Sequence, residues 1–159
     1  MYKRQVDADT KGISIGKEED KMGIRASATA EIIFEDCFVP DSARVGKEGR
    51  GFMIAMQTLQ MSRPVVAAIS VGIAQAAIEA AVAYSHHRKQ FGVKIATFEM
   101  VQQMIADMVM KTEAARILTY KACVAQMNKD KKAGLYSAMS KCFASDTACL
   151  LYTSDAADE

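Results

Sequence analysis

The chain has 159 residues, of which 50% are hydrophobic and 25% are charged, and its formal net charge is +1. This length fits one globular domain or parts of two, and the balanced charge argues against a nucleic acid or a membrane surface as partner. No uninterrupted apolar run of about 18–20 residues is apparent, so we expect no membrane span. The four cysteines have no CxxC spacing, which predicts neither a zinc site nor a disulfide framework and favours a reducing, cytoplasmic location.

The two ends of the chain are expected to be foreign to the rest. Residues 1–5 (MYKRQ) can be encoded by GTG TAT AAG AGA CAG, with GTG assumed to be the start codon, and the reverse complement of this DNA, read one base out of phase, encodes the CLLYT found at residues 149–153. Inverted copies of one element at both ends are typical of a transposon adapter from a sequencing library. We therefore interpret residues 1–5 and 149–159 as non-native and adapter-derived and exclude them from the fold prediction, the alternative being a natural flexible tail.

Residues 6–45 are predicted to form mainly β-strands. Ile13 and Ile15 alternate with polar neighbours, and residues 31–39 are rich in β-branched and aromatic side chains. Pro40 is expected to end the last strand, because proline cannot donate a hydrogen bond to a sheet.

From residue 51 onward the apolar spacing becomes helical. A short helix is predicted near residues 52–59, followed by a second helix that Ser62 caps and that has Pro64 in its first turn. This second helix, to about residue 87, is apolar on nearly every face and is expected to be buried on all sides. Gly72 inside it predicts a close approach of another helix.

Two further helices follow. The spacing predicts one over residues 98–128, a solvated polar turn at 129–134, and another helix that begins near residue 135 and stops at residue 148. The fold class is therefore α+β, with a β part followed by an incomplete up-down helical bundle. Because the apolar helix lacks a full set of neighbours, we expect the isolated chain to be marginally stable or prone to aggregation.

Three pairs of motifs resemble the acyl-CoA dehydrogenase family, specifically its short- and medium-chain members. They are KMGIRASAT (21–29) with IFEDCFVP (33–40), GRGFMIAM (49–56) with SRPVVAA (62–68), and RKQFG (88–92) with Phe98-Glu99. The resemblance covers residues 6–148 and implies an internal fragment of a longer enzyme. It identifies residues 6–45 as the C-terminal part of the middle β-domain and residues 46–148 as the first helices of the C-terminal helical domain.

The resemblance also implies a cofactor site. In the family, the segment matching residues 88–92 contacts the FAD diphosphate bound by the neighbouring subunit, which implicates Arg88, Gln90 and Phe91. Phe98 and Glu99 match a Phe-Gln pair that faces the cofactor, although Glu99 lacks the amide donor and adds a negative charge. Without the resemblance, Arg88 is simply a cation near a helix C-terminus, stabilised by the helix dipole.

Arg63 resembles the family's arginine beside the acyl-CoA thioester, and Gln60 stands where many relatives have Asp. From the residues alone, Arg63 could equally pair with Glu48 or cap a helix. Dehydrogenation needs a base with a tuned pKa, which most of the family places in a segment beyond the position of residue 148. Some branches place it at the position of Ser62, where a hydroxyl without a neighbouring activator is no base. No catalytic residue is therefore assigned within this fragment, and we expect it to be inactive.

The implied parent is an FAD-dependent homotetramer that dehydrogenates acyl-CoA in fatty acid metabolism and passes electrons to an electron-transferring flavoprotein. The alternatives are a helical scaffold or interaction domain and a paralogous flavin enzyme such as an acyl-CoA oxidase. His86 and His87 point about 100° apart on a helix and have no third ligand in view, so no metal site is predicted.

Overall fold

The computed structural model describes residues 3–156 and divides them into two compact units, residues 3–56 and 57–156. The first unit holds β1 (Ile13–Glu18), β2 (Ala30–Phe34), the short 3₁₀ helix η1 (Asp41–Ala43) and the first turns of α1 (Gly51–His87). The second holds the rest of α1, the strands β3 (Lys89–Gln90) and β4 (Val93–Lys94), the 3₁₀ helix η2 (Ile95–Thr97), α2 (Glu99–Met127) and α3 (Ala133–Ala156). The α+β class with a helical bundle is confirmed.

In the first unit β1 and β2 form an antiparallel hairpin, with Ile13 opposite Phe34 and a register shift between Ile15 and Glu18. The prediction that strand structure continues to Pro40 is wrong, because β2 ends at Phe34 and Asp36 adopts a positive φ of 47°. A left-handed residue cannot continue an extended strand. Apolar side chains of the hairpin are exposed in the described unit, Ile15 by 73% and Phe34 by 57%.

Both ends of the chain take part in the fold where they are described. The Gln5 N–H donates to Ala43 O at 3.0 Å, and the Val45 N–H donates to Lys3 O at 2.8 Å. At the other end α3 continues to Ala156, so the prediction that this helix stops at residue 148 is wrong. Leu151 is only 2% exposed and packs with Ala148, which gives the extra turns an apolar anchor. Residues 1–2 and 157–159 of the ends expected to be adapter-derived lie outside the described residues.

The predicted break between two helices at residues 60–62 is also wrong. α1 is continuous from Gly51 to His87 and contains Pro64 in its interior. Ser62 is no N-cap, since its hydroxyl donates to the backbone carbonyl of Leu59 at 3.1 Å, within the same helix. An interior proline normally costs about 3 kcal/mol because one helical hydrogen bond is lost, so this helix needs a compensating contact.

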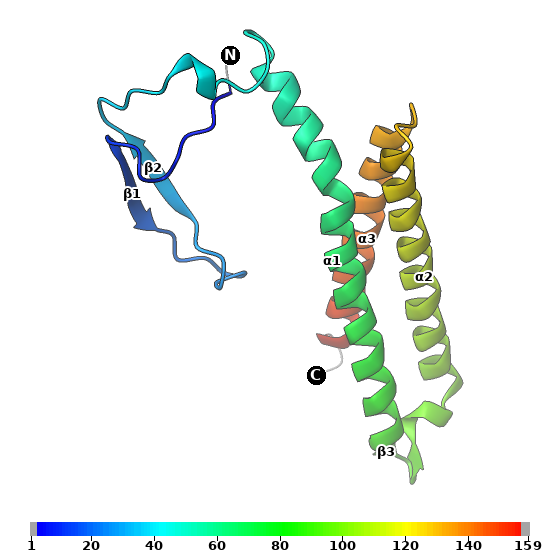
Figure 1. Cartoon of the computed structure of the whole chain (residues 1–159). Coiled ribbons are helices and arrows are strands. Elements are labelled where there is room, and N and C mark those ends of the chain that lie inside the picture. Colours follow the sequence, from blue (N-terminus) through cyan, green and yellow to red (C-terminus); the bar gives the residue numbers. More distant parts are fainter. Residues whose placement is uncertain (1–2, 157–159) are drawn as a thin grey trace. The chain divides into compact units, whose positions relative to one another are not determined.

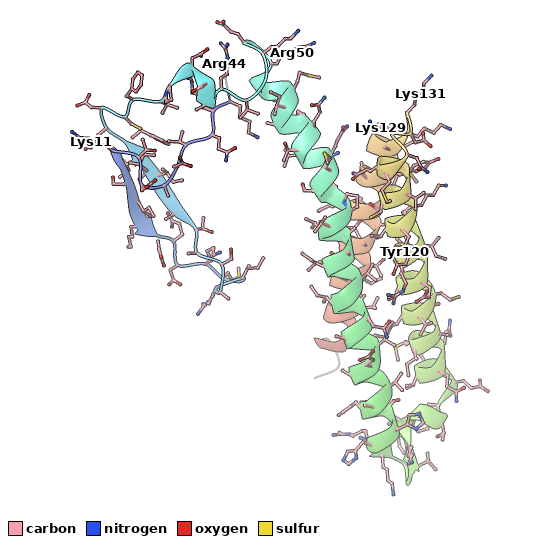
Figure 2. All side chains as sticks on the ribbon, in the orientation of Figure 1. Lys11, Arg44, Arg50, Tyr120, Lys129 and Lys131 are labelled. Carbon is pink, nitrogen blue, oxygen red and sulfur yellow. The ribbon has the colours of Figure 1, made fainter. Side chains whose placement is uncertain are left out.

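The core of the second unit is built from small side chains on three helices, which Figure 1 shows side by side. One cluster joins Ala67 and Val71 of α1 to Ala115 of α2 and Ala144 of α3. A second cluster joins Ala74 and Ile78 of α1 to Ala148 and Leu151 of α3. The predicted helices near residues 98–128 and from about 135 are confirmed by α2 and α3. Lys129 and Lys131 lie at the exposed polar turn that joins α2 to α3 (Figure 2).

The prediction that α1 is buried on all sides is wrong for the described chain. Only one stripe packs on α2 and α3, and the opposite side leaves Val65, Ile69 and Ile73 exposed by 62%, 61% and 51%. Gly72 is exposed too, and a Cβ built there would meet nothing within 4 Å, so none of the described helices packs closely on it. The bundle is thus incomplete on this side.

The expectation that no segment has the length and composition of a membrane span is also wrong. α1 contains an 18-residue window of mean hydropathy 1.9, and only 28% of that window is buried. The run was overlooked because isolated Ser, Gly and Gln residues punctuate it, although none of them carries a charge. Apolar core helices of bundles have the same composition, and α1 does contribute its Ala67, Val71, Ala74 and Ile78 to a core.

Candidate cofactor and substrate sites

The predicted cofactor residues lie in the turn that joins α1 to α2. The Arg88 N–H still donates to Tyr84 O at 2.8 Å, so the helical pattern extends to this residue. The chain then forms the two-residue strands β3 and β4, in which Gln90 pairs with Val93. The Ile95 N–H returns to Arg88 O at 3.0 Å and closes the turn. Short as it is, the turn is held at both ends by backbone hydrogen bonds.

Phe91 and Gly92 form the tip of this hairpin, and both have positive φ angles, 50° and 83°. Positive φ at both central residues is the signature of a type I′ turn, where Asn-Gly is the favoured pair. A bulky phenylalanine in the left-handed region is therefore strained, and such strain clusters at functional sites. The Phe91 side chain is 94% exposed and meets the Phe98 ring edge to face, with centroids 6.3 Å apart.

The polar groups of the turn are available to a ligand. Arg88 and Gln90 are both exposed, and within the described residues no ion pair or side-chain hydrogen bond engages either of them. Glu99, the first residue of α2, is exposed as well and is the acidic residue next to Phe98. The five residues assigned by resemblance to the cofactor, Arg88, Gln90, Phe91, Phe98 and Glu99, thus belong to one turn and the helix start that follows it.

A cavity of about 760 Å³ adjoins this turn within the second unit. Arg88 and Gln90 are among its lining residues, while Tyr84, Met104 and Leu151 contribute apolar surface from the three helices. Asp107 and Lys111 also line it and were not singled out from the sequence. Their i,i+4 spacing is typical of an ordinary surface pair on a helix, so no sequence signal marks them.

The predicted substrate residues lie elsewhere, near Pro64 of α1. Arg63 is partly buried and Gln60 is exposed, while Glu48, the alternative partner of Arg63, lies 3.8 Å from Arg44 as an ion pair. The backbone carbonyl of Gln60 accepts a hydrogen bond from Gln126 Nε2 at 2.7 Å. Gln126 was missed by the sequence analysis. The signal that could have found it is the interior Pro64, which leaves a carbonyl in need of a donor.

The two sets of residues are far apart. Arg63 and Arg88 are separated by about seven turns of α1, which corresponds to about 37 Å at 1.5 Å per residue. The structure therefore brings the cofactor residues together with one another but does not bring them to Gln60 and Arg63. Within one copy of this chain, the two sets cannot surround a common reacting atom.

Metal chemistry finds no support in the described residues. No group of three or more His, Cys, Asp or Glu side chains there is close enough to hold a metal ion. His86 and His87, in the last turn of α1, are both exposed.

Comparison with known proteins assigns the helical part of the chain. Residues 49–156 match the family model described as acyl-CoA dehydrogenase, C-terminal domain. The probable acyl-CoA dehydrogenase FadE25 of Mycobacterium tuberculosis is 48% identical over 143 residues, which are 90% of this chain and 37% of that protein. The chain thus spans less than half the length of this curated relative.

Solved structures agree in fold. Butyryl-CoA dehydrogenase from Megasphaera elsdenii superposes with a TM-score of 0.92 at 42% identity, over 96% of this chain and 40% of that one. The FAD complex of PigA superposes with a TM-score of 0.83 at 30% identity, over 92% of this chain and 38% of that one. The motifs, the fold and these matches agree, and the chain belongs to the acyl-CoA dehydrogenase family, whose C-terminal domain its helices represent.

Proposed function

We propose that this chain is part of a longer FAD-dependent acyl-CoA dehydrogenase that oxidises the Cα–Cβ bond of acyl-CoA thioesters and passes the electrons to an electron-transferring flavoprotein. The observation that carries the proposal is the strained, protruding Phe91 turn with the open guanidinium of Arg88 beside it. The Phe91 ring is 94% exposed, and its edge-to-face contact with Phe98 covers little of its surface, so a ligand supplies the reason for a strained aromatic residue at this tip.

The residues of the turn fit FAD chemically. A guanidinium can donate two parallel hydrogen bonds to a diphosphate, and a side-chain amide such as that of Gln90 can donate more. The rings of Phe91 and Phe98 offer apolar surface to a planar group. The Glu99 carboxylate is the member that fits least, because it adds a negative charge where the family has an amide. FAD, when bound, would accept the hydride that leaves the β-carbon.

The distance between the cofactor residues of the Arg88 turn and the substrate residues Gln60 and Arg63 favours an assembly of several subunits. Since Arg88 and Arg63 are about 37 Å apart along α1, the turn cannot clamp the same flavin that reacts beside Gln60 and Arg63. We infer that the turn grips the diphosphate of FAD held by a neighbouring subunit of a homotetramer. Arg63 and Gln60 then contact the thioester side of acyl-CoA in their own subunit.

The 159-residue chain is expected to be inactive by itself. Removal of the α-proton requires a carboxylate or an equivalent base within hydrogen-bond reach. Ser62 stands where some branches of the family place the base. Its hydroxyl donates a hydrogen bond to the backbone carbonyl of Leu59, and a hydroxyl without an activating neighbour is not a base. The base of the parent enzyme then comes from a segment outside this chain. The described free thiols support a reducing compartment, and we propose a cytoplasmic enzyme.

The test is to recover the complete gene from its source and to purify its product. The proposal expects a yellow protein that anaerobic butyryl-CoA bleaches and that an electron-transferring flavoprotein reoxidises. Rapid reoxidation by oxygen with release of peroxide would instead identify an acyl-CoA oxidase. A colourless oligomer that does not react with acyl-CoA would favour the helical scaffold and contradict the proposal.

A further inference from the structure

The proline inside α1 leaves one backbone carbonyl without its helical partner. In an α-helix the carbonyl of residue 60 would accept from the N–H of residue 64, but Pro64 has no N–H. Pro64 is itself fully buried, so the gap lies on the side of α1 that packs against the other helices. The Gln60 carbonyl has therefore lost its helical donor on this side and can accept a hydrogen bond from a group outside the helix.

Gln126 supplies that donor from α2. Its Nε2 lies 2.7 Å from the carbonyl oxygen of Gln60 and 2.8 Å from the hydroxyl oxygen of Ser137 on α3. The Ser137 hydroxyl proton is already directed to Ala133 O at 2.8 Å, and Ser137 is fully buried. Both partners of Nε2 are thus acceptors, so the NH₂ end of the amide must face them, and both of its protons are used.

The amide therefore fixes one turn of α1 against α2 and α3, and that turn carries Gln60 and Arg63. Gly134 at the start of α3 contributes to the same arrangement, because a Cβ at this position would lie 2.7 Å from Gln60 Nε2. The side chain of Gln60 thus rests on the bare backbone of Gly134. Gln126 thus supplies the donor that Pro64 cannot, on the turn of α1 that carries Gln60 and Arg63.

We propose that Gln126 is a positioning residue for acyl-CoA binding, which holds the Gln60–Arg63 turn of α1 in register for the thioester. The proposal rests on the proposed function, since it assigns that turn to the substrate. Gln126 itself touches neither substrate nor cofactor. Its loss should therefore weaken substrate binding through Gln60 and Arg63, with little effect on the chemical step.

The first experiment compares Gln126→Met with Gln103→Met in the longer enzyme. Met keeps the length of the side chain and removes both donors, and Gln103 is an exposed glutamine on the same helix. We expect the KM and the Kd for butyryl-CoA to rise about tenfold in Gln126→Met, with kcat within about twofold, and neither to change in Gln103→Met. An unchanged KM in Gln126→Met, even with a lowered melting temperature, overturns the proposal.

Pro64→Ala separates positioning from general stability. Alanine at this position provides the N–H that Gln60 O lacks, so the amide of Gln126 is no longer required there. The double variant Pro64→Ala/Gln126→Met should recover most of the lost affinity relative to Gln126→Met alone. Independent, additive effects of the two substitutions would contradict the coupling. Gly134→Ala, which displaces only the Gln60 amide, should raise KM without changing the bond to Gln126.

A readout on the 159-residue chain keeps this inference distinct from the proposed function. Hydrogen exchange of the backbone amides of residues 61–63, 65 and 66 should accelerate about fivefold or more in Gln126→Met and return toward the original rate in the double variant. If the longer protein neither holds FAD nor reacts with acyl-CoA while this exchange pattern appears, the proposed function fails and the role of Gln126 in the turn stands. If the exchange rates do not change, the positioning role itself is overturned.

Discussion

The rings of Phe91 and Phe98 meet edge to face, with centroids 6.3 Å apart and an interplanar angle of 83°. This contact ties the tip of the β3–β4 hairpin to the start of α2, where Phe98 is the N-cap residue. Edge-to-face pairs of this kind contribute about 0.5–1.5 kcal/mol. The contact partly offsets the strain of a phenylalanine at a φ of 50° and keeps its ring outside the bundle.

Phe91→Asn should therefore stabilise the hairpin and impair the cofactor site. Asn-Gly suits a type I′ turn, and relief of left-handed strain is worth about 1–2 kcal/mol, which offsets or exceeds the roughly 0.5–1.5 kcal/mol lost with the Phe98 contact. Urea unfolding of the chain, followed by circular dichroism, should show equal or greater stability. The longer enzyme carrying the same change should retain less FAD after gel filtration. Gly92→Ala is the control, since its φ of 83° predicts a loss of stability. Reduced stability of Phe91→Asn would contradict the strain assigned to this residue.

Arg88→Ala should weaken FAD binding in the longer enzyme. A charge-assisted hydrogen bond contributes about 1.5–3 kcal/mol, so the Kd for FAD should rise about tenfold to a hundredfold. Lys89→Ala removes the same charge from the adjacent exposed position and should change the Kd by less than about threefold. Fluorescence titration of the apoenzyme measures both values. Equal losses in the two variants would mean that the turn attracts FAD by general charge, with no specific contact from Arg88.

Gly72→Ala should raise the stability of the chain by about 1 kcal/mol, because alanine has the higher helix propensity. The added Cβ meets no atom within 4 Å in the described residues, so no steric cost opposes the gain. The free energy of unfolding in urea measures the change. A loss of stability would show that another surface packs closely on Gly72 under the conditions of the experiment.

Local patterns predicted the helices well and the interruptions poorly. The 3–4 spacing of Val101, Met104 and Ile105 was enough to predict α2, since it depends on the residues of that segment alone. Where α1 passes through Pro64, the Gln60 carbonyl accepts from Gln126, which is 66 positions away in the sequence. No local rule contains that contact. The end of β2 at Phe34 was missed for a related reason, because the β-rich composition continues while the backbone turns at Asp36.

The candidate sites also differ in whether a local sequence pattern can predict them. The Arg88 turn is continuous in sequence, so a motif could predict that its five residues lie together. The distance between this turn and Arg63 follows only from the continuity of α1, and it is consistent with the separate cofactor and substrate assignments made from the resemblance. The roles of these residues remain predictions that the variants above test.

Substitutions on the open face of α1 should determine how the isolated chain behaves in solution. Ile69→Lys with Ile73→Lys replaces two side chains that are 61% and 51% exposed, and it should increase solubility and suppress aggregation without unfolding the helices. Ile78→Lys, at 8% exposure in the core of the second unit, should unfold the chain instead. Light scattering and circular dichroism distinguish the outcomes. If the Ile69/Ile73 variant aggregates as much as the original chain, another surface causes the aggregation.

Thr112 lies at the centre of α2 with only 1% of its surface exposed, and its hydroxyl has no hydrogen-bond partner among the described residues. A buried hydroxyl without a partner costs about 1–3 kcal/mol, and valine has nearly the same shape without the polar group. Thr112→Val should therefore raise the free energy of unfolding by about 1 kcal/mol.

Thr119, two turns further along α2, is the matched control, because its hydroxyl donates to Ala115 O at 2.8 Å and it is 5% exposed. Thr119→Val removes that bond but leaves no unpaired acceptor, since the Ala115 carbonyl keeps its helical backbone partner, so stability should change by less than about 1 kcal/mol. Urea unfolding of the two variants and the original chain measures the difference. If Thr112→Val is less stable than the original chain, a water or another polar group satisfies this hydroxyl, and the core at Thr112 is more polar than its neighbours indicate.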